Sequence, residues 1–414
     1  MMIGLALAVW TPAGLAQGAQ GRLWTFSDVL QAAIFGHPNV LAQRANAAAA
    51  QSDYEAAKWQ RFPTPSFTAS AGDSNYSQNP SPQRFALQQP LWTGGRITAG
   101  IDASFARKEA ADFATAETQV ELAVRVATAY VEAARQQMRE EQGQRSVDEH
   151  KRLLDLIERR VSQEISAPVD RELAQSRLYL AMSDLSFNTQ ARLSALASLS
   201  QLAGQPIERV ASLDAPLPSP PTREGEAMDA ALAASPTISR IEAEARAASA
   251  DVDSRRSAVW PQLSVRYERD FGGPTGALAP LTDHRVFLLL EATPGAGLAS
   301  LSNIEAARQR QNSLEHARAG ATRDVREQIL IDLNELRQAS LRLETAEQSR
   351  KTAGSVFDSY TRQYTTGRKT WIDVMNSVRE FTQAEFSVAD AAAQRATAAL
   401  RLAIRTGTVQ PLAK

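Results

Sequence analysis

Two long proline-free stretches constrain the fold of this chain more than any other feature. No proline occurs from Leu91 to Ala167, and none occurs from Gly295 to Gln410. Proline breaks a helix because it lacks a backbone N–H and clashes with the turn before it, so each stretch is free to form one long helix. The first helix is expected over Gly95–Val161, which is 67 residues, or roughly 100 Å. Such a helix must pack against other helices along its length.

The apolar residues of these stretches follow the spacing of packed helix pairs. They lie alternately four and three positions apart, which is the heptad pattern of a coiled coil rather than the face of a globular helix. Glu385 is the one polar residue in the second series. We therefore expect antiparallel hairpins of long helices. The two series are Val120, Val124, Ala127, Val131, Ala134 and Met138, and then Val374, Val378, Phe381, Glu385 and Val388.

The chain also repeats itself, with a period near 200 residues. Landmark residues of the first half return in the same order in the second half, displaced by 198 to 203 positions. That period is far longer than the period of a solenoid repeat, so the sequence indicates a tandem duplication of a larger unit. The matched landmarks are Pro38 and Pro236, Asp53 and Asp251, Pro63 and Pro261, Phe85–Gly95 and Phe287–Gly297, and Asp170 and Asp373.

Each repeat is predicted to contain a helix, two short strands, and a long helix that turns back on itself. Apolar and polar residues alternate from Leu263 to Glu268, which is the pattern of a half-buried strand. Pro63 and Pro261 are expected to end the first helices, because the residue before a proline disfavours helix. The predicted fold class is mainly α with a small β part. The expected first helices are Ser27–Trp59 and Glu226–Ala258, and the expected strands are Pro65–Ala71, Arg84–Trp92, Gln262–Phe271 and His284–Ala292.

The segments outside the two repeats complete the predicted division of the chain. Residues 1–20 carry no charge and contain a short apolar run over Ile3–Trp10, which is typical of a signal peptide cleaved after Ala16 or Ala19, although the usual basic residue is missing. Residues 204–225 contain five prolines, so a connector without regular structure is expected there. The predicted division is a signal peptide at 1–20, repeats at 21–203 and 226–405 with the connector 204–225 between them, and a tail at 406–414.

The composition of the chain argues against several classes of function. The chain has 45 Lys and Arg against 46 Asp and Glu, and the resulting net charge of −1 does not favour nucleic acid as a partner. It has no cysteine, which removes disulfides, thiolate catalysis and thiolate metal sites. Its four histidines are too far apart in the sequence to form a helical zinc pair. We expect no enzymatic activity, no cofactor and no bound metal.

The four predicted strands cannot close a sheet within one chain. An open sheet edge is not tolerated in membrane hydrocarbon, because its backbone groups would lack hydrogen-bond partners. If the strands cross a membrane, the chain must therefore assemble with copies of itself. Three copies supply about twelve strands, in the range where a barrel has a water-filled lumen. In such a barrel we expect Leu263, Val265 and Tyr267 to face lipid, with Arg266 and Glu268 facing the lumen.

Two motifs give the sequence a resemblance to a known family. Gln89–Arg96 leads into the first long helix, and Tyr364–Val374 combines Tyr, Gly, basic residues and Asp at the second helical tip. With Pro63 and Pro261 before the first strands, these motifs resemble the TolC-type outer-membrane efflux and secretion proteins over nearly the whole chain after the signal peptide. The resemblance implies a homotrimer in the cell outer membrane. It also implies a twelve-stranded transmembrane β-barrel joined to an α-helical barrel that extends into the periplasm.

The resemblance further implies a gate at the periplasmic tips. In that interpretation the Asp373 carboxylates form a ring around the axis, and either Arg368 or Lys369, together with Tyr364, bonds to Asp170 of a neighbouring hairpin. Asn376 takes the place of a second acid, so the ring should bind a multivalent cation more weakly. The competing interpretation is that these acids are ordinary helix-start residues favoured by the helix dipole. The residues of the predicted gate are Asp373, Asn376, Tyr364, Arg368, Lys369 and Asp170.

Two functions of different classes remain open. The first is an outer-membrane conduit for substrates delivered by an inner-membrane ABC or proton-driven transporter through a periplasmic adaptor. Type I protein secretion is favoured over drug efflux, because lipidated drug-efflux channels carry an N-terminal cysteine that is absent here. The second is a periplasmic adaptor or coiled-coil scaffold. The chain is predicted to have two helical hairpins and few strands outside the two strand pairs, which fits an adaptor or scaffold less well.

Overall fold

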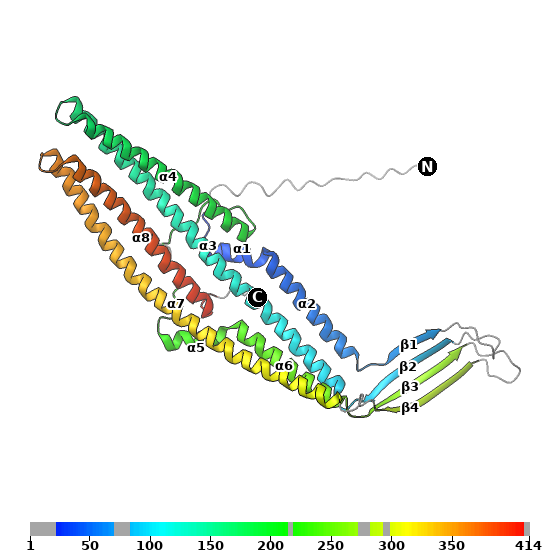
Figure 1. Ribbon diagram of the computed structural model, residues 1–414. Helices are drawn as coiled ribbons and strands as arrows, with labels where there is room; N and C mark the ends of the chain where they lie inside the picture. The colour runs from blue at the N-terminus through cyan, green and yellow to red at the C-terminus, as the bar shows by residue number, and fades with distance from the viewer. Residues whose placement is uncertain (1–21, 70–82, 214–217, 272–281, 293–298, 410–414) are drawn as a thin grey trace, which may run out of the picture. The chain divides into compact units, whose positions relative to one another are not determined.

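The computed structural model describes residues 22–69, 83–213, 218–271, 282–292 and 299–409, and it is mainly helical with one small sheet (Figure 1). The predicted fold class, mainly α with a small β part, is confirmed. The predicted signal peptide at 1–20 lies outside the described residues. The elements are α1 (Phe26–Gly36), α2 (Pro38–Trp59), β1 (Thr64–Ala69), β2 (Gln83–Trp92), α3 (Arg96–Ser162), α4 (Pro168–Ala203), α5 (Glu224–Ala234), α6 (Pro236–Ser257), β3 (Gln262–Phe271), β4 (Thr282–Glu291), α7 (Ala299–Thr365) and α8 (Trp371–Arg405).

The two longest helices occupy the proline-free stretches of the sequence. α3 and α7 have 67 residues each, and α3 is displaced from its predicted position by one residue. α3 begins after Gly94 and Gly95, whose φ angles of 61° and 91° lie in the left-handed region that glycine tolerates. A Cβ on Gly94 would lie 3.0 Å from the Cβ of Trp260, so this turn needs glycine for space as well. Among the described residues, no helix has both the length and the apolar character that a membrane span requires.

α4 and α8 run back along α3 and α7 as the second arms of two antiparallel hairpins (Figure 1). Ion pairs join the arms. Arg192 of α4 lies 2.5 Å from Glu140 of α3, and Arg401 of α8 lies 2.7 Å from Asp332 of α7. Residues of the predicted series, such as Val131, are buried in the packed faces. The expected hairpins of long helices are therefore present.

The first helix of each repeat is broken, which corrects the sequence prediction. A single helix is expected over Ser27–Trp59, but His37 stands between α1 and α2 in an extended conformation, with φ −70° and ψ 128°. The second repeat breaks in the same way at Ser235, with φ −73° and ψ 110°. In both places a proline follows, disfavours helix in the residue before it, and starts the next helix without losing a needed N–H. The duplicated prolines Pro38 and Pro236 thus produce duplicated breaks.

The four strands form one antiparallel sheet in the order β1-β2-β3-β4. All four predicted strands are confirmed, and within the described residues their bounds differ from the prediction by two residues at most. A register shift between Pro90 and Trp92 places a bulge at the end of β2. Because β1 and β4 are the edge strands, each has one side without a strand partner among the described residues.

The described residues divide into two compact units. Unit 1 takes its residues from 1–41, 119–234 and 326–414, and unit 2 takes its residues from 42–118 and 235–325. Unit 1 contains the turns of both hairpins. Unit 2 contains the sheet and the helical segments that lead into it. Each unit therefore draws on both sequence repeats, and α3 and α7 take part in both units.

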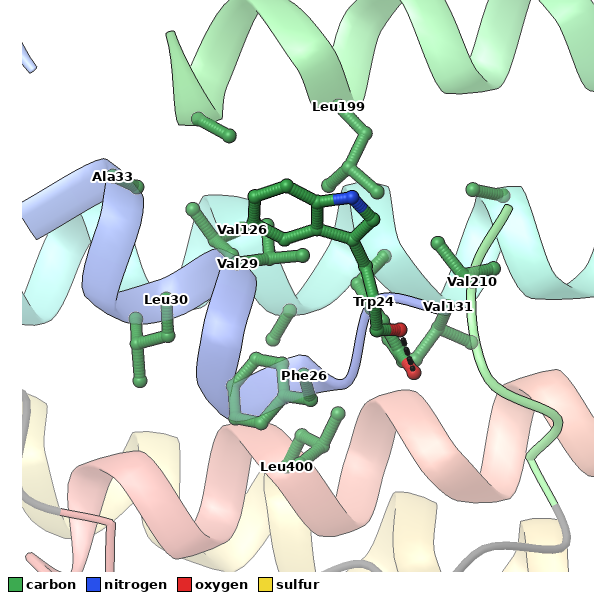
Figure 2. Packing of buried hydrophobic residues seen from close by; sticks show 14 of the residues in the cluster. Trp24, Phe26, Val29, Leu30, Ala33, Val126, Val131, Leu199, Val210 and Leu400 are labelled. Carbon is green, nitrogen blue, oxygen red and sulfur yellow. Dashed lines mark hydrogen bonds between the residues drawn. The ribbon is translucent and has the colours of Figure 1, made fainter. Parts of the chain in front are cut away.

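The main apolar cluster of unit 1 is built from α1, α3, α4, α8 and the connector (Figure 2). Val210 of the connector is fully buried and forms an isolated parallel bridge with Trp24. The Tyr130 hydroxyl bonds to the carbonyl oxygens of Trp24 at 3.4 Å and Ala211 at 3.3 Å, and burial raises the pKa of Tyr130 to about 12. Residues 224 and 225 of the predicted connector belong to α5. Apolar residues of its described part, such as Val210, belong to the core, which its proline content did not predict.

Candidate functional site

The candidate gate lies in unit 1, where the two helical hairpins turn. Each turn contains one residue with positive φ, Glu164 at 59° and Gly367 at 72°. Glycine adopts this conformation freely, whereas a glutamate adopts it at some cost. The helices that follow also differ. α4 starts with Pro168 after Ala167, whose side chain makes no cap bond, while α8 starts with a capping box.

An apolar cluster packs directly behind the two turns. Tyr364 is 6% exposed and Trp371 is 3% exposed, and their ring centroids lie 5.1 Å apart. The Arg160 guanidinium lies 4.8 Å from the centroid of the Tyr364 ring, a favourable cation–π distance. Because Arg160 belongs to the first hairpin and Tyr364 to the second, the cluster joins the two tips. Its buried members are Leu153, Ile157, Ala174, Phe357, Tyr364, Trp371, Val374, Met375 and Val378.

A hydrogen bond also joins the two turns. The Tyr364 hydroxyl lies 3.0 Å from Oγ of Ser166, and Nε of Arg160 donates to the same oxygen at 3.4 Å. The sequence prediction instead gives Tyr364 a bond to Asp170 of a neighbouring hairpin. Within one chain the partner is Ser166, to which the sequence analysis assigns no role. The bond to Asp170 of another copy stays a prediction.

Asp373 caps the first turn of α8. Its carboxylate accepts hydrogen bonds from the backbone N–H of Thr370 at 3.0 Å and from the Thr370 hydroxyl at 2.8 Å. Its own N–H donates back to the Thr370 hydroxyl oxygen at 3.3 Å. The Thr370 hydroxyl, its backbone N–H and the positive charge of Lys369 together lower the pKa of Asp373. The Asp373 carboxylate is therefore ionised at neutral pH. Part of its hydrogen-bonding capacity is used by the two bonds from Thr370.

The remaining residues of the predicted gate lie around the same turns. Nζ of Lys369 lies 4.1 Å from the centroid of the Tyr360 ring. Arg368 and Asn376 are exposed. Asp170 is half-buried in the first turn of α4. One chain thus brings all the predicted gate residues to the two tips, but none of the described contacts is an ion pair between Asp170 and a basic residue of the second turn.

Tyr364→Phe should loosen the two tips. The variant removes the hydroxyl that bonds to Ser166 but keeps the ring in the apolar cluster. A net hydrogen bond contributes about 0.5–1.5 kcal/mol, so amide exchange at the second turn should accelerate up to about tenfold. Hydrogen exchange measured by mass spectrometry checks this. Tyr54→Phe, on a half-buried tyrosine of α2 in unit 2, is the control. Equal exchange in both variants would show that the hydroxyl does not hold the tips.

A polar layer interrupts the apolar packing between the two clusters of unit 1. Gln142, Ser146 and His150 succeed one another every four residues along α3, and each is less than 9% exposed. The Ser146 hydroxyl bonds to the Thr382 hydroxyl of α8 at 3.3 Å. Glu385 stands three residues beyond Thr382. Burial raises the pKa of Glu385, and the charges of Arg145 and Arg350 from the neighbouring long helices oppose that rise.

Glu385→Gln should raise the melting temperature of the purified protein near neutral pH. A carboxyl whose pKa is raised by folding costs stability while it is ionised, and this cost disappears as the pH falls through the folded-state pKa. The difference between the variant and the wild type should therefore shrink as the pH is lowered from neutral through the raised folded-state pKa toward the ordinary value of 4.5. Glu380→Gln, at an exposed position of α8, is the control. A constant difference at all pH values would contradict this account of Glu385.

The two faces of the sheet in unit 2 differ in chemistry. Leu263, Val265 and Tyr267 share one face, and they pair with Leu290, Leu288 and Val286 of β4. These three β4 side chains are 67–68% exposed, so an apolar surface covers this side of β3 and β4. Pro63 and Pro261 stand one residue before β1 and β3. The structure therefore places the residues predicted to face lipid together on one face.

The opposite face carries a charged network around Glu268 and Asp270. Nε of Arg84 lies 2.7 Å from Oδ1 of Asp270, and Arg285 lies 2.6 Å from Oδ2 of the same carboxylate. Glu268 is 7% exposed and lies within 4 Å of three arginines, Arg84, Arg266 and Arg285. Its burial was not expected, because the alternating sequence pattern gives the face of a residue but not which residues of the adjacent strands stand beside it.

The chain was compared with known protein families and with proteins of known sequence. Residues 29–205 match the family model described as outer membrane efflux protein. The predicted resemblance to the TolC-type outer-membrane efflux proteins is confirmed. No curated protein matches the chain in sequence.

Several solved structures of low sequence identity share the fold of this chain. CusC has a TM-score of 0.80 at 14% identity, with 97% of this chain and 99% of that chain covered. The outer membrane protein VceC from Vibrio cholerae has a TM-score of 0.77 at 15% identity, with coverage of 92% and 96%. The open state of the MtrE outer membrane channel from Neisseria gonorrhoeae has a TM-score of 0.78 at 16% identity, with coverage of 92% and 88%.

Proposed function

We propose that three copies of this chain form an outer-membrane channel of a tripartite export system. The observation that carries the proposal is the sheet, which among the described residues has four strands, two edges without a strand partner, one apolar face and one charged face. Strands β2, β3 and β4 have 10 residues each, the length of a membrane-crossing strand. Three copies give about twelve strands, which close the edges into a β-barrel with the charged network facing the lumen.

Exposed apolar side chains of the helical hairpins also support assembly with other copies of the chain. Tyr179, Leu180, Phe187 and Leu193 of α4 are more than half exposed, and exposed apolar surface of this extent marks an interaction site. In the proposed homotrimer these side chains pack against a neighbouring copy and build an α-helical barrel that reaches into the periplasm. The hairpin tips with Asp373, a ring of three carboxylates in the trimer, then form the periplasmic gate.

The proposed partners follow from the chemistry of a passive conduit. Energy and substrate selection come from an inner-membrane transporter, either ABC or proton-driven, which a periplasmic adaptor connects to the tips. We infer type I protein secretion as the finer function from the absence of cysteine. The description of the matched family as an efflux protein favours small-molecule efflux as the second candidate. A deletion strain separates them: loss of a secreted protein supports the first, and increased drug sensitivity without that loss supports the second.

Membrane fractionation tests the conduit itself. The protein should appear in the outer-membrane fraction as a heat-modifiable trimer, and the purified trimer should conduct ions in a planar bilayer. A soluble periplasmic monomer would contradict the proposal and favour an adaptor or scaffold.

A further inference from the structure

A cavity lies on the charged face of the sheet, at the end where the strands meet the helices. It has a volume of about 410 Å³, and its lining comes mainly from the start of α3 and from all four strands. Gln262, Ser264 and Arg266 of β3 line it together, because alternate residues of a strand share one face. Every lining residue belongs to unit 2. A cavity of this size has room for a small organic molecule.

Arg96 borders this cavity at a position that is unfavourable for a cation. It is the first residue of α3, and a helix N-terminus carries a partial positive charge that favours anions. Nη2 of Arg96 donates to the amide oxygen of Gln262 at 3.4 Å. Nε of Arg96 is buried and has no hydrogen-bond partner among the described residues. A buried donor without an acceptor costs free energy, so the site lacks an acceptor and a negative charge.

Arg266 supplies a second guanidinium group to the lining. Its Nε and Nη2 both donate to the amide oxygen of Gln88, at 3.2 Å and 2.6 Å. The side-chain amide of Gln88 in turn donates to Oγ of Ser264 at 3.0 Å, and Ser264 is 5% exposed. A carboxylate oxygen of Glu268 lies 3.7 Å from Nη1 of Arg266. The amide of Gln88 therefore fixes the orientation of this guanidinium group but does not neutralise it.

The charge of the cavity differs from that of the network farther along the strands. There, Arg84 and Arg285 lie 2.7 Å and 2.6 Å from the carboxylate of Asp270. The lining of the cavity has one carboxylate, that of Glu291, and Glu291 forms no ion pair with any residue that the structure describes. Two guanidinium groups thus face one carboxylate across this cavity, and the excess positive charge favours an anion.

We propose that this cavity binds the phosphate or carboxylate group of an exported solute. The N–H groups of Arg96 and Arg266 match the oxygens of such anions, and the hydroxyls of Thr93 and Ser264 also line the cavity. In the proposed channel the charged face lines the lumen, so each of the three copies presents one cavity to a passing solute. The inference rests on the proposed function for this placement. It goes further by naming an anionic class of solute and the residues that bind its charge.

Phosphorus NMR of inorganic phosphate tests the binding site. The purified trimer in detergent is titrated with phosphate in a chloride buffer of constant ionic strength, and broadening of the phosphate line reports binding. Arg96→Gln should weaken the affinity about tenfold, because hydrogen bonds to a charged group are lost. The variant should still fold, since it removes a cation from a helix N-terminus, and its melting temperature checks this. Arg310→Gln, at an exposed position of α7 in unit 2, should leave the affinity unchanged.

Glu291→Gln should have the opposite effect on phosphate binding. It removes the carboxylate that borders the cavity, so the affinity should rise about threefold. Opposite changes in Arg96→Gln and Glu291→Gln identify recognition of charge, whereas general loosening of the sheet would weaken binding in both variants and overturn the proposal. Succinate and glycerol phosphate are then added as competitors. Displacement of phosphate by both assigns the site to either anion, displacement by glycerol phosphate alone assigns it to phosphates, and displacement by neither would overturn it.

Planar-bilayer recordings separate this inference from the proposed function. Phosphate should reduce the chloride current through the wild-type channel, and Arg96→Gln should restore the current. A trimer that conducts ions but binds phosphate equally well with and without Arg96 would overturn the anion site and leave the channel standing. Phosphate that binds at Arg96 without changing the current would overturn the assignment to an exported solute. Protein that binds phosphate through Arg96 but forms no trimer would instead contradict the proposed function, and with it the placement of the cavity in a lumen.

Discussion

Asp332→Ala should lower the free energy of unfolding of unit 1 by about 3 kcal/mol, because it removes the fully buried carboxylate that two half-buried arginines share. Asp332 is 0% exposed and lies on α7. It accepts a hydrogen bond from Arg401 at 2.7 Å and a second from Arg405, both of α8. One carboxylate thus holds two arginines of the returning helix. The melting temperature of the purified protein should fall by about 10 °C.

Glu335→Ala is the matched control for this prediction. Glu335 lies one helical turn from Asp332 and also pairs with Arg401, at 2.7 Å, but its side chain is 48% exposed. An exposed pair contributes only about 0–1 kcal/mol, so this variant should melt within a few degrees of the wild type. If Asp332→Ala and Glu335→Ala melt alike, burial of the carboxylate is not what holds α8 to α7.

Val265→Arg should prevent assembly of the protein in the outer membrane. Val265 stands near the middle of β3 and pairs with Leu288 on the apolar face of the sheet. A charged side chain on the lipid face of a barrel costs about 2–4 kcal/mol near the bilayer midplane. Three copies would each carry this cost. The amount of heat-modifiable trimer in outer-membrane fractions measures the effect.

Thr68→Arg is the control for the facing of the sheet. Thr68 is exposed on β1 and pairs with Arg84, so it belongs to the charged face that the proposed barrel turns toward water. This variant should assemble and change only the ion selectivity of the channel. Assembly of Val265→Arg at the wild-type level would show that the apolar face does not meet lipid.

The fold was predictable from the sequence because its strongest signals are local and repeated. The absence of proline predicted α3 and α7, and the alternation of apolar and polar residues from Leu263 to Glu268 predicted β3. The break at His37 was missed, because the effect of a proline on the residue before it was applied at Pro63 but not at Pro38. The role of Val210 in the core was also missed, because packing of an irregular segment depends on contacts between residues distant in the sequence.

The candidate gate was predictable only in part. The motif at Tyr364–Val374 located the tip, and the family resemblance supplied the roles of its residues. Ser166 as the partner of Tyr364 was not predicted, because the bond joins turns 198 positions apart in the sequence. The capping role of Asp373 was the alternative interpretation of a helix-start acid, and its bonds to Thr370 show that this role is filled.

Cross-linking between the edges of the sheet tests the central claim most directly. The chain has no cysteine of its own, so introduced cysteines report one contact. Phe67→Cys on β1 is combined with Leu288→Cys on β4, or with Val286→Cys to allow for the register between copies. All three side chains are at least 63% exposed within one chain. After oxidation in outer-membrane vesicles, a non-reducing gel should show covalent species that end at three copies. Monomer alone, or a ladder that continues beyond three copies, would contradict a sheet closed by a trimer.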